Sequence, residues 1–217
     1  MEGNIELIVT SIKELTKKRR LVYINYEPAF ALYAAELRKF GIKDGESVRK
    51  EAYDSLIDDV LSKRATVRAM ALLKNKDYTR KGFEDKLRDG YYPDTSIDYA
   101  LEYVTRFGYI NDERFAENYV NFKAGNKPRR QIELKLKQKG VNADIISRVC
   151  DEFYADNCDI ELEQAKLFVE RKHIDFANTD YKEIQKVKAA LYRKGFSMDI
   201  INKALDSKGL FLDIIDN

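Results

Sequence analysis

The sequence has few of the residues on which catalytic and metal sites are usually built. Its 217 residues include one histidine, His173, two cysteines, three prolines and no tryptophan. A catalytic triad or a Cys-His pair could draw only on His173, whose neighbours Arg171 and Lys172 indicate the charged end of a helix. Cys150 and Cys158 form no CxxC pair, so neither a zinc site nor a disulfide framework is indicated. We therefore predict a protein that is not an enzyme and holds no metal or cofactor.

Phosphate-binding loops and membrane segments are missing as well. The ten glycines are scattered, and neither a GxxxxGK[ST] loop nor a GxGxxG turn occurs. No apolar run approaches the ~20 residues that a membrane-spanning helix needs. Two unpaired cysteines, of which Cys150 stands at an expected core position, suit a reducing environment. The expected setting is the cytoplasm, with no membrane partner.

What the sequence does contain is a segment that occurs three times, at a period near fifty residues. Each copy has two apolar residues four apart and then a turn position, and the same steps kept in register predict a tandem helical array. Tyr91 stands where the other copies have glycine, so the first turn is expected to be built differently. The copies are Phe83-x3-Leu87-x3-Tyr91, Ile132-x3-Leu136-x3-Gly140 and Val187-x3-Leu191-x3-Gly195.

The expected fold is mainly α, with three three-helix units in tandem behind a small α+β module that begins with a β-hairpin. The expected boundaries are 1–63 for the module and 64–110, 111–158 and 159–217 for the units. The 3.6-residue period and the capping residues predict helices near 66–76, 80–89, 94–107, 112–124, 128–139, 143–155, 160–173, 180–194 and 198–207.

The N-terminal module is predicted from alternating apolar residues. They indicate two strands between residues 5 and 27, joined by a turn at Lys17–Arg20, in a hairpin or a three-stranded sheet. Pro28 is expected to end the second strand. Helices are expected from Phe30 to Phe40 and from about residue 49 to 63.

Positive charge is concentrated in the middle of the chain, although the net charge is only +2. Residues 123–140 hold seven basic side chains and one acidic one. If Ile132 and Leu136 face inward, these charges face solvent, where they could pair with phosphates or an acidic protein surface, or only solubilise the helix. The candidate binding residues are Lys123, Lys127, Arg129, Arg130, Lys135, Lys137 and Lys139, with Arg80, Lys81 and Arg88 on the matching helix of the first unit.

Two stretches resemble a known family. The run Phe107-Gly108-Tyr109-Ile110-Asn111-Asp112-Glu113-Arg114-Phe115-Ala116 resembles the signature of RecX, the bacterial regulators of RecA recombinase. The run Lys127-Pro128-Arg129-Arg130-Gln131-Ile132, continued by Lys139-Gly140-Val141, resembles the second stretch of that pattern. The resemblance covers about residues 65–207, and the N-terminal module looks like the extension on RecX proteins of low-GC Gram-positive bacteria.

The resemblance implies a regulatory protein of DNA repair, recombination and the SOS response. Such a protein binds RecA filaments on single-stranded DNA, restrains their growth or promotes their disassembly, and so lowers ATP hydrolysis and strand exchange. Carried onto this sequence, the first candidates for contact are Arg129 and Arg130. Single-stranded DNA itself is a second candidate partner, and a monomer is expected because nothing resembles a coiled-coil seam.

Two other interpretations stay open. A transcription regulator of helix-turn-helix type would bind DNA directly, with Arg130 and Gln131 on its recognition helix. A scaffold that binds only protein would never touch nucleic acid. The salt dependence of binding separates these cases, because phosphate contacts weaken steeply as salt rises.

Overall fold

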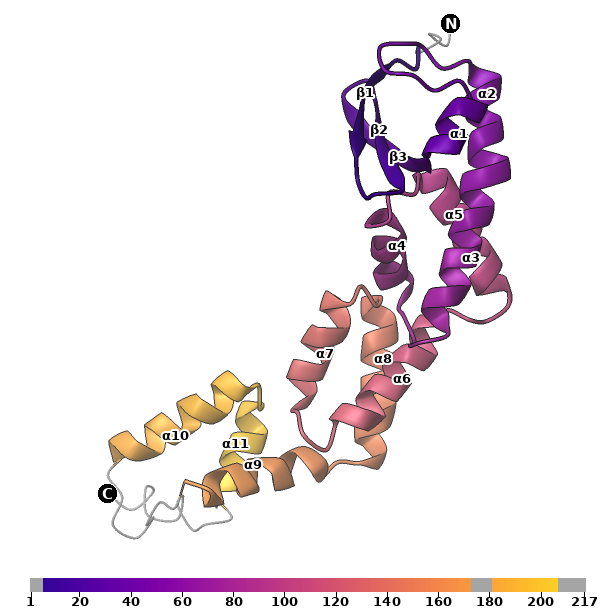
Figure 1. Cartoon of the computed structure of the whole chain (residues 1–217). Helices are drawn as coiled ribbons and strands as arrows, with labels where there is room; N and C mark the ends of the chain where they lie inside the picture. The colour runs from indigo at the N-terminus through magenta and orange to yellow at the C-terminus, as the bar shows by residue number, and fades with distance from the viewer. Residues whose placement is uncertain (1–5, 173–180, 207–217) are drawn as a thin grey trace, which may run out of the picture. The chain divides into compact units, whose positions relative to one another are not determined.

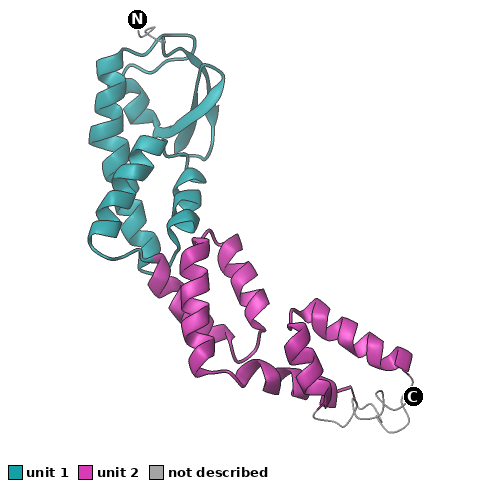
Figure 2. Cartoon of the chain, turned by 180° about the vertical axis from the view of Figure 1, so that it is seen from behind, with its two compact units in different colours: residues 1–111 teal, residues 112–217 magenta. Residues whose placement is uncertain are grey.

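The computed structural model describes residues 6–172 and 181–206, and the chain divides into two compact units, residues 1–111 and 112–217 (Figures 1 and 2). His173, the expected connection 174–180 and the last eleven residues lie outside the described part. The mainly helical fold with a small N-terminal sheet is confirmed. The four-part division of the chain stays a prediction.

The first unit begins with a three-stranded antiparallel sheet. Its strands are β1 (Val9–Glu14), β2 (Arg19–Ile24) and β3 (Glu27–Tyr33), in the order β1-β2-β3. The prediction for Pro28 was wrong, because Pro28 lies in β3 opposite Tyr23 and the helix α1 (Ala34–Lys39) begins only after that strand. An edge strand tolerates proline since one side of it makes no ladder hydrogen bonds.

The two strands β2 and β3 are joined by Asn25 and Tyr26, which have φ values of 50° and 70°. Two residues at positive φ are typical of a tight hairpin turn. The predicted turn at Lys17–Arg20 is too long at its C-terminal end, since Arg19 and Arg20 already belong to β2. Strand pairing thus begins two residues earlier than the charge pattern indicated.

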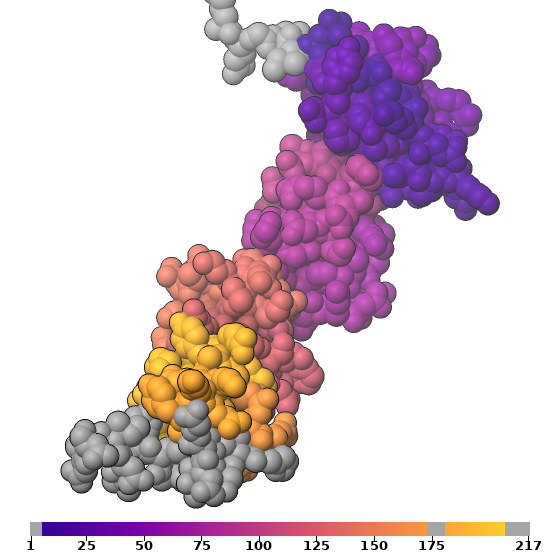
Figure 3. All heavy atoms as spheres, turned by 90° about the vertical axis from the view of Figure 1, so that its left-hand side faces the viewer, coloured from indigo at the N-terminus to yellow at the C-terminus, as the bar shows by residue number. Residues whose placement is uncertain are grey.

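One long helical run connects the sheet to the first three-helix unit. It consists of α2 (Lys50–Leu56), the π-helical turn η1 (Ile57–Leu61) and α3 (Ser62–Leu73). Leu56, Ile57 and Leu61 are buried with the core of the sheet, whereas Ala65 and Ala69 belong to the core of the helices that follow. The space-filling view shows continuous atoms from the sheet to these helices (Figure 3).

The first three-helix unit is formed by α3, α4 (Arg80–Arg88) and α5 (Asp94–Arg106). Phe83 and Leu87 of α4 are fully buried against Ile97 and Leu101 of α5. The predicted inward face of this repeat is therefore confirmed.

The second compact unit holds two more sets of three helices (Figure 2). One has α6 (Asp112–Lys123), α7 (Arg129–Gln138) and α8 (Ala143–Asp156), and the other has α9 (Ile160–Glu170), α10 (Tyr181–Lys194) and α11 (Met198–Asp206). Ile132, Leu136 and Leu191 are fully buried, and Val187 is nearly so. From α4 to α11 the helices agree with the predicted ranges within a few residues. The largest difference at a C-terminal end is in α9, which ends at Glu170 and not at residue 173 as predicted.

The turn after α4 is built like the other two, contrary to the prediction. Tyr91 adopts a φ of 59°, and Gly140 and Gly195 adopt 82° and 99° at the equivalent positions. The Tyr92 amide donates to the Leu87 carbonyl at 3.4 Å, and the residues after both glycines make the same six-residue bond. This is a Schellman turn, whose left-handed position normally takes glycine. Tyr91 occupies it at a cost of about 1 kcal/mol.

Neither cysteine is paired. Cys150 is fully buried, as predicted, and Cys158 is exposed. Burial raises the pKa of the Cys150 thiol to about 11, which keeps it protonated near neutral pH. Among the described residues, no group of three metal-binding side chains occurs and no helix is long and apolar enough to cross a membrane.

Candidate interaction surface

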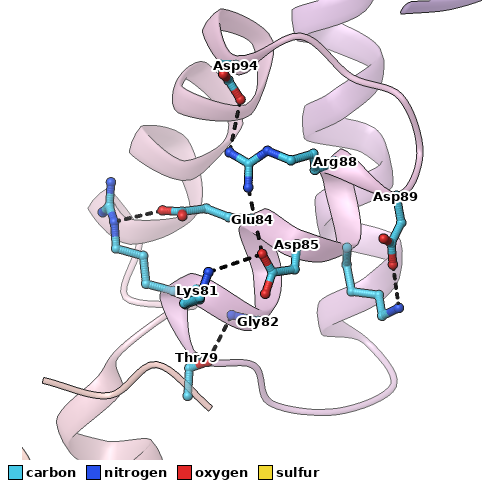
Figure 4. Close-up of polar contacts among 10 residues, drawn as sticks. Thr79, Lys81, Gly82, Glu84, Asp85, Arg88, Asp89 and Asp94 are labelled. Atoms are coloured by element: carbon cyan, nitrogen blue, oxygen red, sulfur yellow. Dashed lines mark hydrogen bonds and ion pairs between the residues drawn. The ribbon is translucent and has the colours of Figure 1, made fainter. Parts of the chain in front are cut away.

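The basic side chains of α4 are neutralised by neighbouring acids (Figure 4). Asp85 lies between Lys81 and Arg88, at 3.4 Å and 3.7 Å from their nitrogens, and Arg88 also reaches Asp94 of α5 at 3.0 Å. These spacings of three and four residues bring opposite charges together on one helical face. The predicted candidates Lys81 and Arg88 therefore already have protein partners.

The remaining cations of α4 follow the same rule. Arg80 pairs with Glu84 at 3.3 Å, and Lys86 pairs with Asp89 at 2.9 Å. Most of these side chains are exposed, so the pairs contribute little to stability. Their main consequence is electrostatic: α4 carries many charges but offers little positive potential.

The helix α7 occupies the same place in the next repeat. Its buried residues Ile132 and Leu136 correspond to Phe83 and Leu87, so every position of α4 corresponds to the α7 position 49 residues later. In this register Lys81 becomes Arg130 and Arg88 becomes Lys137. Of the four acids that pair with α4 cations, only Glu84 keeps an acidic counterpart, Glu133. The other three correspond to uncharged residues: Asp85, Asp89 and Asp94 correspond to Leu134, Gln138 and Ala143.

Arg130, Leu134 and Lys137, which we call the α7 face, lie together beside a surface hollow of about 430 Å³. Ala143 and Ile146 of α8 line the same hollow, as does Glu133, which pairs with Arg129. Leu134 is 53% exposed. An apolar side chain between two cations gives a surface that can both contact a partner and attract negative charge.

The cations of the α7 face form no ion pair with any described residue. The Arg130 guanidinium carbon lies 5.6 Å from the centre of the Tyr192 ring, a contact that leaves its N–H donors available. The Lys137 side chain is exposed and forms neither a hydrogen bond nor an ion pair within the described part of the chain. The difference between α4 and α7 is thus the loss of acids, not the gain of bases.

Arg129 has a different environment from its neighbour Arg130. Its Nε donates to Glu133 at 2.7 Å and its Nη2 to Asp151 of α8 at 2.6 Å. Burial lowers the pKa of the Arg129 guanidinium, but the bonds to both carboxylates outweigh burial and leave it above the ordinary value. The hydrogen bond from Arg129 also lowers the pKa of Asp151. Arg129 thus ties α7 to α8.

The start of α7 is also fixed by the last three-helix set. The Arg129 amide donates to the Glu161 carboxylate at 2.9 Å, which places a negative charge at the positive end of α7. Burial raises the pKa of Glu161, against the hydrogen bond from the Arg129 amide, which lowers it. The Gln131 side-chain amide donates to the Lys194 carbonyl at 2.6 Å. These contacts hold the N-terminal turn of α7 in place.

The other predicted basic residues are dispersed around α7. Lys123 lies over the Phe122 ring at 4.3 Å, and Lys135 donates to Gln138 at 2.8 Å. Lys139 lies 5.6 Å from the ring centre of Phe115. The remaining one, Lys127, precedes the helix, is half-buried and lines a hollow of about 330 Å³.

Sequence reasoning did not single out Leu134, which lies between the two cations of the α7 face. The signal was present, because aligning the copies position by position shows uncharged residues where Asp85, Asp89 and Asp94 stand in the first copy. A count of basic residues alone ranks Arg129 beside Arg130, although Arg129 is bound to two carboxylates.

Comparisons with known proteins agree with this architecture. Models of the second and third three-helix domains of RecX match residues 111–149 and 159–205. A crystal structure of the regulatory protein RecX superimposes with a TM-score of 0.60, covering 92% of this chain and 99% of that one, at 21% identity. That of RecX from Lactobacillus salivarius gives 0.59 over 69% of this chain and 97% of that one, at 26% identity.

Full-length relatives are similar to almost the whole chain. The "Regulatory protein RecX" of Clostridioides difficile is 25% identical over 204 residues, which cover 92% of this chain and 94% of the relative. That of Caldanaerobacter subterraneus subsp. tengcongensis is 31% identical over 201 residues, which cover 92% of this chain and 98% of the relative. The chain belongs to the RecX family of regulatory proteins.

Proposed function

We propose that this protein modulates, and mainly inhibits, RecA by binding RecA filaments on single-stranded DNA, and that the α7 face makes an essential contact. One observation carries the assignment of the site: Arg130 and Lys137 have no ion pair within the described residues, while their counterparts Lys81 and Arg88 do. Unpaired exposed cations interact with phosphates or acidic side chains without first breaking an internal pair.

The proposed action needs binding energy and no chemistry. A protein that binds assembled and disassembled RecA with different affinity shifts the balance between them by that difference alone. Relatives of this chain are named as regulatory proteins, which supports a non-enzymatic role. We propose that the chain acts as a monomer in a reducing cytoplasm, where its free cysteines would stay reduced.

The structure weakens one form of the alternative, a transcription regulator that reads bases through α7. Gln131, the amide expected to face a base, donates to the Lys194 carbonyl inside the protein. A base-reading glutamine would have to break this bond and leave a backbone carbonyl without its partner. If the α7 face touches nucleic acid, we propose that it contacts the backbone phosphates and not the bases.

The test is the single-stranded-DNA-dependent ATPase of the cognate RecA, titrated with this protein. We expect inhibition well below one molecule per RecA protomer, because one molecule bound to a filament affects many protomers. No effect on the ATPase, together with tight and salt-sensitive binding to duplex DNA, would contradict the proposal and favour the transcription regulator.

A further inference from the structure

A second positively charged site lies in the first compact unit, where the sheet meets the helices. A hollow of about 570 Å³ is lined there by Arg19 of β2, Arg64 and Arg68 of α3, and Lys86 of α4, with Tyr33 and Tyr92 beside them. The only acid in its lining is Asp89, which pairs with Lys86. Arg64 pairs with Glu36, which lies outside the lining. The hollow keeps a net positive charge because Arg19 and Arg68 form no ion pair with any described residue.

Arg64 is held rigidly at the wall of this hollow. One of its terminal nitrogens, Nη2, pairs with Glu36, and its guanidinium carbon lies 4.9 Å from the centre of the Tyr33 ring. Its other terminal nitrogen, Nη1, is buried and has no hydrogen-bond partner among the described residues. A buried N–H donor without an acceptor is unfavourable, so an anion that reached it would gain a charge-assisted bond.

Two more guanidinium groups stand beside Arg64. Arg19 donates from Nη2 to the Gly90 carbonyl at 2.7 Å, which anchors the start of β2 to the turn after α4. Arg68 follows Arg64 by one helical turn, is exposed, and forms no ion pair with any described residue. Both contribute to the same hollow from different elements, so the folded unit is what brings the charges together.

The pKa of Tyr92 shows that the charges of the three arginines act on its hydroxyl. Burial raises the pKa of the Tyr92 hydroxyl, while the charges of Arg64, Arg19 and Arg68 act to lower it. The ring packs against the backbone of Gly90, where an added Cβ would lie 3.0 Å from its Cε2 atom. An aromatic ring next to three guanidinium groups is a surface on which a base can stack.

We propose that this hollow binds a phosphate group of single-stranded nucleic acid, with the adjoining base resting on Tyr33 or Tyr92. Guanidinium groups match the geometry of phosphate oxygens, and arginine next to aromatic rings is how single strands are bound without sequence preference. The volume suits one nucleotide. An acidic peptide would use the cations but not the rings, so the nucleic acid fits more of the site.

The first test is fluorescence anisotropy of a labelled oligothymidylate. It compares Arg68→Ala with Arg49→Ala, an equal charge change about 28 Å farther along the same helical run. Both changes are made in the chain that also carries Arg130→Ala and Lys137→Ala, so that the α7 face does not contribute. We expect Arg68→Ala to weaken binding five- to tenfold and to reduce the slope of log affinity against log salt by about 0.7. Equal affinities and slopes for the two variants would overturn the proposal.

The second test locates the strand directly. A bromodeoxyuridine oligonucleotide is cross-linked to the full chain by ultraviolet light, and the modified peptides are identified by mass spectrometry. Cross-links at Tyr33 or Tyr92 support the proposal, and cross-links confined to the peptides of α7 overturn it. Arg68-dependent binding of polyglutamate that is tighter than that of the oligonucleotide would also overturn it, in favour of an acidic protein segment. A chain that inhibits RecA but shows no Arg68-dependent DNA binding would keep the proposed function and lose only this site.

Discussion

The helices α4 and α7 occupy the same place in successive repeats and carry similar numbers of basic residues, yet they present different surfaces. On α4 the acids Asp85, Asp89 and Asp94 pair with the cations, and on α7 their places are taken by uncharged residues. Repetition gives both helices the same core, so selection can act on the exposed positions of one copy alone. The two helices differ in how much of their positive charge is unpaired and not in its amount, and our proposal assigns partner binding to the helix with the unpaired charge.

The largest effect is expected from removing the unpaired cations. Arg130→Ala with Lys137→Ala should weaken binding to RecA filaments about 30-fold, since two exposed charge contacts of about 1 kcal/mol each are lost. The matched variant, Lys81→Ala with Arg88→Ala, removes the corresponding cations of α4 and should change binding less than about threefold. Filament binding can be measured by biolayer interferometry on immobilised RecA–DNA. Equal losses from the two variants would remove the distinction between the helices.

The next effect separates neighbouring arginines. Arg129→Ala should lower the free energy of unfolding by about 1–2 kcal/mol, because it leaves Glu133 and Asp151 without their common partner. Arg130→Ala should change it by less than about 0.5 kcal/mol. Urea denaturation followed by circular dichroism measures both. A stable Arg129→Ala protein with weakened filament binding would show that Arg129 contacts the partner instead.

The turns that end α4 and α7 allow a smaller test. Tyr91→Gly should raise the free energy of unfolding by about 0.5–1 kcal/mol, since glycine takes the left-handed conformation without strain. Gly140→Ala should lower it by about 1 kcal/mol. Thermal denaturation of both variants measures these two changes in the free energy of unfolding, which should have opposite signs. A destabilised Tyr91→Gly protein would mean that contacts of the Tyr91 ring outweigh its backbone strain.

The smallest effect is expected from converting α4 into a copy of α7. Replacing Asp85, Asp89 and Asp94 by Leu, Gln and Ala frees Lys81, Lys86 and Arg88, and should raise affinity for an oligothymidylate a few-fold with a steeper salt dependence. The control changes the net charge equally at exposed acids elsewhere, through Asp44→Asn, Asp98→Asn and Glu102→Gln. The same gain in both proteins would show that net charge alone sets the affinity.

Much of the fold could be predicted because the repeats are amphipathic and end in recognisable caps. Asn142 accepts a hydrogen bond from the Asp144 amide as an N-cap residue should, and the helix boundaries follow. The sheet was harder, since β3 contains Pro28 and short strands give weak patterns. The conformation of Tyr91 could not be predicted, because the repeat imposes on a tyrosine a turn that favours glycine.

The candidate site could be predicted only in part. The sequence places Arg130 and Lys137 on one face, since they are seven residues apart on a helix. The pair of Arg129 with Glu133, four residues away, is a local pattern. The sequence does not show the other two contacts of Arg129, because Asp151 lies 22 residues away and the carboxylate at its amide, Glu161, lies 32 residues away. Long-range pairs form only once the helices have packed, so no local sequence pattern predicts them.

The most direct measurement restores the missing acid. In α4 an aspartate stands between the two cations, and Leu134→Asp places one at the same position of α7, with Leu134→Asn as the uncharged control. Each protein is titrated into the single-stranded-DNA-dependent ATPase of RecA. We expect that only Leu134→Asp raises the concentration for half-inhibition, by about five- to tenfold. The reason is that Arg130 and Lys137 become paired with the new aspartate, as Lys81 and Arg88 are paired with Asp85. Identical inhibition by Leu134→Asp and the wild-type chain would contradict the claim that unpaired charge on the α7 face drives regulation.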